Sequence, residues 1–137
     1  MPPKNDCCFC GSRKPFSECC KPYLEGKKVL DGDTPEYVLR SRFSACVLGD
    51  GEYMLKTWDE NFRPKIKARF LGQEIKSQNY TKLEIVCITL DNSDRNKAQI
   101  EFFARFRQNR SLGYQHELSS FIKKDGVWYY TDGVILD

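Results

Sequence analysis

The chain has 137 residues, of which 40% are hydrophobic and 30% charged. This composition suits one globular domain and excludes an intrinsically disordered chain. The net charge of only +3 excludes the strongly basic surface of a typical nucleic-acid-binding protein.

The start of the chain and its cysteines indicate the compartment. Residues 1–6 contain no apolar stretch of the kind that a signal peptide needs, and nowhere do about 18 apolar residues follow one another. We therefore expect a soluble, cytoplasmic protein without a transmembrane segment. Of the seven cysteines, five lie between positions 7 and 20, and in a reducing compartment such a cluster favours metal binding over disulfides.

Residues 8–20 have the form C-x-C-x8-C-C, in which two close pairs of thiols flank a loop of turn-forming residues. Four thiolates can converge from this spacing, and tetrahedral sulfur coordination suits zinc and also accepts iron. A closed shell of four cysteines leaves no position for water, so we expect a structural site and not a hydrolytic one. The predicted ligands are Cys8, Cys10, Cys19 and Cys20.

The other three cysteines receive different predictions. Cys7 could replace Cys8 as a ligand, because the two are adjacent. Cys46 and Cys87 fall in apolar stripes, where a cysteine is usually a small buried hydrophobe. The alternative for the cluster itself is free thiols or disulfides, but a bridge between the adjacent Cys19 and Cys20 would be strained.

A helix is predicted after a short charged linker at residues 27–33. Thr34 can cap its start, with Pro35 at the first helical position, and Gly49 is expected to end it. The apolar residues fall at i, i+4, i+7 and i+8 and form one face of the helix. They are Leu39, Phe43, Cys46 and Val47.

Two further helices are predicted over residues 51–58 and 63–70, and Pro64 limits where the second can begin. The second stretch carries basic residues without acidic ones, namely Arg63, Lys65, Lys67 and Arg69. Such a run is more typical of a solvated face than of a nucleic-acid site, so we do not expect nucleic acid as a partner.

Four strands are predicted after these helices. In the first, Leu83, Ile85 and Cys87 alternate with the residues between them in a stretch rich in β-branched side chains. The other strands are expected over residues 100–107, 112–123 and 127–131, with turns at 91–94 and 124–126. Helices followed by strands predict an α+β fold.

Polar residues on the predicted strands form a candidate pocket. The set comprises Glu101, Arg105, His116, Glu117, Trp128, Tyr130 and Asp132. His116 is the only histidine and titrates near neutrality, so it is the candidate acid or base. Neighbours in a strand point to opposite faces, so His116 and Glu117 can share a cavity only across a bulge. The alternative is cross-strand ion pairs on a solvated or dimer-facing surface, with Trp128 and Tyr130 as core or interface aromatics.

These residues carry a resemblance. Residues 8–20 resemble the SEC-C motif, the small metal-binding element at the end of the translocation ATPase SecA. Four further blocks resemble the YchJ-like family: 20–24 (CKPYL), 40–45 (RSRFSA), 53–58 (YMLKTW) and 128–133 (WYYTDG). The chain departs from that family at Arg13, where members usually have Gly, and at Asp59, where they commonly have His. Many members also carry a second SEC-C copy at the C-terminus, whereas this sequence stops at Asp137.

The resemblance implies a SEC-C metal-binding motif at residues 1–26 and an NTF2-like (nuclear transport factor 2, cystatin-like) domain at residues 27–137. In that fold a curved antiparallel sheet wraps around helices, and the cone can hold a ligand. Some members of the superfamily are enzymes that use this cavity, and others are binding or dimerisation modules. Fold alone does not choose between these roles.

The resemblance also implies an interaction role. The SEC-C element of SecA engages the chaperone SecB and can contact anionic lipid. We therefore expect a zinc- or iron-binding adaptor whose basic side chains Arg13, Lys14 and Lys21 dock on a SecB-like chaperone, the ribosome or another anionic surface. The alternative is a small-molecule-binding protein or enzyme that uses the NTF2-like cavity. Catalysis at the closed metal site is not expected.

Overall fold

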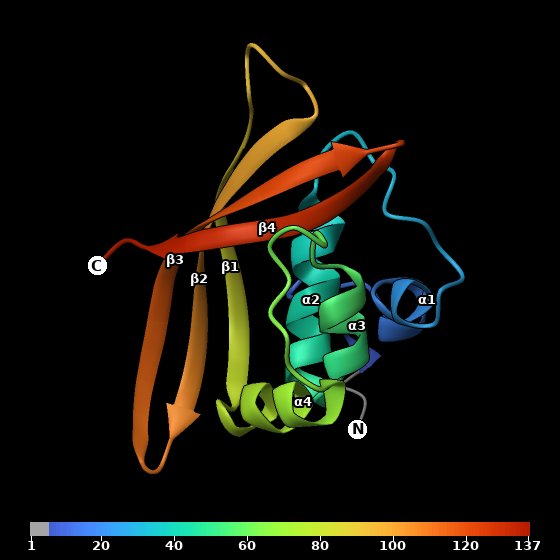
Figure 1. Ribbon diagram of the computed structural model, residues 1–137. Helices are drawn as coiled ribbons and strands as arrows, with labels where there is room; N and C mark the ends of the chain where they lie inside the picture. Colours follow the sequence, from blue (N-terminus) through green and yellow to red (C-terminus); the bar gives the residue numbers. More distant parts are fainter. Residues whose placement is uncertain (1–5) are drawn as a thin grey trace.

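The computed structural model describes residues 6–137, so residues 1–5 of the predicted metal-binding segment lie outside the described part of the chain. Its elements follow in this order: η2 (Phe16–Glu18), α1 (Lys21–Leu24), α2 (Glu36–Leu48), α3 (Gly51–Lys56), α4 (Ala68–Ser77), β1 (Tyr80–Leu90), β2 (Lys97–Gln108), β3 (Ser111–Lys124) and β4 (Val127–Ile135). The helices precede the strands, which confirms the predicted α+β fold (Figure 1). Within residues 6–137, every helix is too short or too polar to cross a bilayer.

The four strands form one antiparallel sheet in the order β1-β2-β3-β4. The register shifts twice along β1, between Tyr80 and Lys82 and between Ile85 and Cys87, and once between Ser120 and Phe121 of β3. Such bulges increase the local twist and bend a strand. In Figure 1 the sheet curves around helix α2, with β4 crossing in front of the helices.

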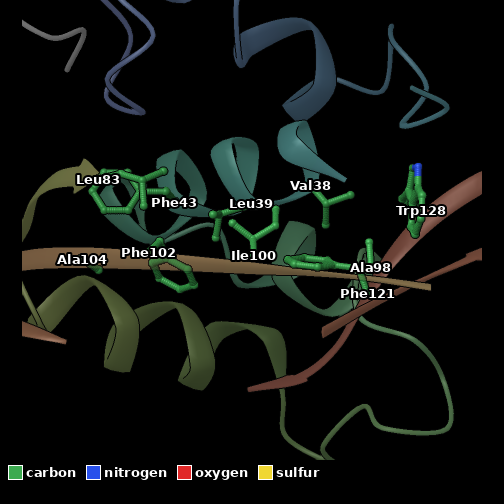
Figure 2. Packing of buried hydrophobic residues seen from close by; sticks show 10 residues of the cluster. All are labelled: Val38, Leu39, Phe43, Leu83, Ala98, Ile100, Phe102, Ala104, Phe121 and Trp128. Carbon is green, nitrogen blue, oxygen red and sulfur yellow. The ribbon is translucent and has the colours of Figure 1, made fainter. Parts of the chain in front are cut away.

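The hydrophobic core lies between α2 and the inner face of the sheet (Figure 2). Helix α2 contributes Val38, Leu39 and Phe43 to this core, and alternate residues of β2 pack against them from the sheet. The buried members from the sheet are Leu83, Ala98, Ile100, Phe102, Ala104, Phe121 and Trp128. This is the apolar face that the alternation in residues 100–107 predicts, and it fixes which face of β2 points away from the core.

Helix α2 starts at Glu36, one residue later than predicted, and the Thr34 hydroxyl accepts a hydrogen bond from the Glu36 amide at 3.3 Å. It ends as predicted at Gly49, whose φ of 76° is the left-handed conformation that glycine adopts without a steric penalty. The predicted linker at residues 27–33 is hydrogen-bonded to β4. Trp128 donates from its amide to Leu30 O and from its indole to Gly32 O.

The position of helix α4 differs more from the prediction than that of any other described element. The helix covers residues 68–77 instead of 63–70, and its N-terminal neighbour Lys67 is extended with ψ of 139°. Pro64 disfavours helical geometry in the residue before it and cannot donate a hydrogen bond within a helix. Leu71 and Ile75 of α4 instead pack against a cluster containing Tyr53 of α3.

The predicted burial of Cys87 in strand β1 is wrong. The alternation predicts Cys87 on the inner face with Leu83 and Ile85, but the bulge between Ile85 and Cys87 inverts the pattern. Cys87 is exposed, and Ile88 packs against the core instead. Cys46 of α2 is only partly buried, although burial still raises the pKa of its thiol to about 11.

Candidate metal centre

Tight local turns bring the two pairs of cysteines together. The Cys8 amide donates to Lys14 O at 2.8 Å, and the Gly11 amide donates to Cys8 O at 3.3 Å. Gly11 has φ of 81°, a left-handed conformation that closes the turn after Cys10. On the other side of the loop, the short η2 element leads directly into Cys19, whose amide donates to Phe16 O.

The thiols of Cys8, Cys10, Cys19 and Cys20 converge. Their sulfur atoms all lie within 4.8 Å of one another, and the side chains are buried. The Sγ atoms of Cys10 and Cys19 are 3.6 Å apart. A tetrahedron with metal–sulfur bonds of ~2.3 Å has edges of about 3.8 Å. These four residues could therefore hold a tetrahedral metal ion with little movement.

Helix α2 presents a second, polar face to this group of sulfurs. Tyr37 Oη lies 3.3 Å from Cys19 Sγ, and Ser44 Oγ lies 3.6 Å from Cys8 Sγ. Arg40 donates from Nη1 to Cys10 O at 2.8 Å, and the same nitrogen is 3.8 Å from Cys10 Sγ. Residues 37, 40 and 44 follow the i, i+3, i+7 spacing of one helix face.

The sequence analysis missed these three contacts, although a signal for them exists. Tyr37, Arg40 and Ser44 form a polar stripe beside the apolar stripe of the same helix. Arg40 also pairs with Glu36 at 2.7 Å, and burial opposes its charge while Glu36 and Cys10 raise its pKa above the usual value. A cation beside sulfur favours the thiolate form that a metal ligand requires.

The charge balance of the sulfurs depends on their neighbours. Hydrogen bonds from Cys10 and Cys20 lower the pKa of Cys8 far below the ordinary value of a thiol. Hydrogen bonds with Cys10 and Cys8, together with burial, strongly raise the pKa of Cys20. The first thiolate is stabilised by protonated neighbours, whereas further negative charges in so small a buried volume need a cation. The donor set therefore fits a divalent metal.

Cys7 and the basic residues lie outside this group. The Cys7 thiol faces Arg13 O at 3.9 Å instead of the other sulfurs. Arg13, Lys14 and Lys21 are all exposed, and Lys14 Nζ donates to Tyr37 Oη at 3.2 Å. Arg13 has φ of 70°, the left-handed region, which explains in physical terms why the resembling family favours glycine there.

The structure divides the candidate pocket residues among several places. Glu101, Arg105 and His116 lie on the outer face of the sheet, away from the core. His116 Nε2 is 2.7 Å from Glu101 Oε2, and its Nδ1 is 2.8 Å from Asp137 Oδ1. Its ring stacks on Phe103 with centroids 4.2 Å apart. Arg105 pairs with Glu84 of the neighbouring strand, so this surface carries the cross-strand ion pairs of the alternative interpretation.

The remaining pocket residues face other surroundings. Glu117 and Tyr130 line an inner cavity of about 290 Å³ between the helices and the sheet. As expected for strand neighbours, His116 and Glu117 point to opposite faces. Trp128 is 1% exposed and belongs to the core. Asp132 is exposed and accepts a hydrogen bond from the Thr131 hydroxyl.

Asp59, which stands where the resembling family commonly has His, joins the end of α3 to the sheet. Its side chain is 2% exposed and its Oδ2 lies 2.7 Å from Lys124 Nζ. Its amide donates to Tyr130 O at 2.7 Å, and its Oδ1 accepts from the Asn61 amide. These contacts give Asp59 a structural role in this chain.

Comparisons with known proteins match both parts of the structure. The family model described as "YchJ, middle NTF2-like domain" matches residues 34–133. A SEC-C motif containing protein from Rhodopseudomonas palustris is 29% identical with a TM-score of 0.82, over 95% of this chain and 98% of that one. A second such protein, from Psychrobacter arcticus, is 27% identical with a TM-score of 0.77, over 96% of this chain and 82% of that one.

Proposed function

The chain belongs to the YchJ family with its NTF2-like domain, and from this membership we propose that it is a metal-binding interaction module. In this proposal Cys8, Cys10, Cys19 and Cys20 hold one zinc ion, with iron as the alternative. The observation that supports it is the convergence of four buried sulfur atoms within 4.8 Å. The ion would neutralise the thiolates and stabilise a segment too short to form a core of its own.

The metal part of the proposal is tested by metal content. Protein purified without added metal should contain about one zinc or iron ion per chain, as measured by inductively coupled plasma mass spectrometry. Cys10→Ser, which removes one ligand, and the double variant Cys19→Ser, Cys20→Ser, which removes two, should both lose this metal. Cys7→Ser and Cys87→Ser are matched controls and should retain it. Free titration of all seven thiols in metal-free, folded wild type would overturn the assignment.

The docking part of the proposal is supported by position and charge. A closed sulfur shell offers no open coordination site, so the segment contributes through its surface and not through chemistry at the metal. Arg13, Lys14 and Lys21 are exposed around the cysteines. We propose that they bind an anionic or chaperone-like partner of the secretion or translation machinery in the cytoplasm, where reducing conditions maintain free thiols.

Partner recovery tests the docking proposal. Wild-type protein and the double variant Cys19→Ser, Cys20→Ser serve as baits in lysate, and a third bait carries Arg13→Gln, Lys14→Gln and Lys21→Gln. Both variants should recover less of the same partner, and the charge variant should do so with its metal content unchanged. Equal recovery by all three baits would contradict a docking role while leaving the metal assignment intact.

A further inference from the structure

The inner cavity is lined mostly by apolar side chains but contains one buried cation. Its walls come from α2, α3, α4 and the inner face of the sheet. Leu39, Phe102 and Phe121 are among the apolar groups that line it. Arg42 of α2 lines the same cavity, and only 7% of its surface is exposed. Arginines are mostly exposed unless they are paired with an acidic group, so the burial of Arg42 is unexpected.

Arg42 is held in place by one end of its guanidinium group. Nη1 donates to Met54 O at 2.7 Å and to Thr57 Oγ1 at 2.9 Å. The group lies 4.3 Å from the ring centre of Tyr130 and 5.1 Å from that of Trp58. Among residues 6–137, nothing accepts a hydrogen bond from Nε or Nη2. The orientation of the guanidinium is therefore fixed while part of its donor capacity is unused.

The charge of Arg42 also lacks a counter-ion. Within the described residues, no carboxylate oxygen lies within 4.0 Å of its guanidinium nitrogens. Burial lowers the pKa of Arg42 to about 10, so the group is still a cation at neutral pH. Buried charges in proteins are normally paired, because desolvation without a partner costs several kcal/mol per ion. The cation–π contacts of Arg42 with Tyr130 and Trp58 offset only part of that cost.

The acidic residue that lines the cavity does not act as the counter-ion of Arg42. Glu117 lines the same cavity from β3, but it forms no ion pair within residues 6–137. Burial raises the pKa of its carboxyl, which favours the neutral form. Arg42 is therefore a cation without an ion pair in this cavity, and the remaining, mostly apolar walls favour an apolar occupant.

We propose that this cavity is a binding site for a small carboxylate with an apolar body, whose carboxylate pairs with Nε and Nη2 of Arg42. An arginine offers two parallel donors to a carboxylate, so a bidentate pair fits the unused side of the guanidinium. A water occupies ~30 Å³ of liquid, so the cavity of about 290 Å³ holds on the order of ten non-hydrogen atoms. This site shares no residue with the four proposed metal ligands.

The test compares three probes of equal chain length: octanoate, octan-1-ol and octylammonium. Binding to the metal-loaded full chain is followed by amide chemical shifts at Ala104 and Phe121. Octanoate should bind about tenfold or more tightly than octan-1-ol, because the hydrogen-bonded ion pair exceeds the apolar contacts alone by at least that factor. Octylammonium should bind least, because it places a second cation beside Arg42.

Variants assign the effect to individual side chains. Arg42→Met should abolish the preference for octanoate over octan-1-ol, whereas Arg105→Met, on the outer face, should leave it unchanged. Ala104→Leu fills the cavity while retaining Arg42, and it should weaken both probes. Equal affinity of octanoate and octan-1-ol for wild type would overturn the proposal. Unchanged octanoate binding by a folded Ala104→Leu would overturn it as well, so it stays testable even where Arg42→Met does not fold.

Discussion

The guanidinium of Arg40 contacts three groups: the Glu36 carboxylate of its own helix, the Cys10 carbonyl and the Cys10 sulfur. Groups that hydrogen-bond metal ligands orient them and moderate their charge, and their removal commonly costs 10–100-fold in affinity. Because α2 supplies Arg40, the metal-binding segment depends on the rest of the domain.

We expect Arg40→Gln to lower zinc affinity by about tenfold without removing the site, because all four sulfurs remain. Competition with a chelator of known affinity measures the change. Glu36→Gln is the matched control, since it removes the ion pair at 2.7 Å but leaves the contacts of Arg40 with Cys10. If both variants lose affinity equally, the helix pair and not the contact with Cys10 is responsible.

Contacts within a short segment can be predicted from the sequence, whereas contacts between residues far apart in the chain cannot. The convergence of Cys8, Cys10, Cys19 and Cys20 follows from turns and spacing within a short segment. The contact of Ser44 with Cys8 joins residues 36 positions apart, and neither residue type nor local spacing specifies it. The burial of Arg42 could not be predicted either, because single arginines are usually exposed.

At the element scale, helices α3 and α4 approach each other closely through two glycines. A Cβ atom on Gly72 would lie 2.4 Å from Gly49 O, and one on Gly51 would lie 1.9 Å from Ala68 O. Both contacts are with backbone atoms, which cannot rotate away. The packing of Leu71 and Ile75 against Tyr53 therefore depends on the absence of these side chains.

Gly72→Ala should destabilise the fold by about 1–3 kcal/mol, although alanine in a helix interior is intrinsically favoured over glycine by about 1 kcal/mol. Urea denaturation of the metal-loaded protein measures the free energy of unfolding. Gln73→Ala, at the exposed neighbouring position of the same helix, is the control and should be neutral or slightly stabilising. A Gly72→Ala protein as stable as this control would contradict the close approach.

The α2 helix and the succession of strands along the chain could be predicted, because the end signals of the helix are strong and the apolar residues of the strands alternate. The position of α4 could not, since Lys67 at its N-terminus makes no capping hydrogen bond with its side chain and gives no start signal. Strand β1 was predicted, but the exposure of Cys87 was not. A bulge depends on the pairing of two strands, here β1 with β2, and the sequence of one strand does not contain that information.

At the scale of the whole molecule, the outer face of the sheet ties the last residues to the middle of β3. The Leu136 amide donates to His116 O at 2.8 Å, and the His116 ring lies between Glu101 and Asp137. Hydrogen bonds to Glu101 and Asp137 raise the pKa of His116 above its ordinary value of 6.5. The imidazolium form is therefore the one that the fold stabilises.

The sign of the pH dependence follows from this shift. Because the folded-state pKa lies above the unfolded value, the contribution of His116 to stability is complete below about pH 6.5 and is lost as the pH rises through the folded-state pKa. Denaturation midpoints across this window should fall with pH in wild type and change less in His116→Gln. Since His116 is the only histidine, its NMR titration is unambiguous, and a pKa at or below 6.5 would contradict the prediction.

Helix α2 is the wall shared by the two proposed sites. Tyr37, Arg40 and Ser44 face the sulfurs from one side of the helix, and Arg42 faces the cavity from another. If metal uptake shifts the helix axis at all, it also changes the position of the buried guanidinium. Thermodynamic linkage is reciprocal. A molecule bound in the cavity must then change the affinity for the metal by the same factor by which the metal changes the affinity for that molecule. With a rigid α2, only the electrostatic effect of the metal charge on the cavity would couple the two sites.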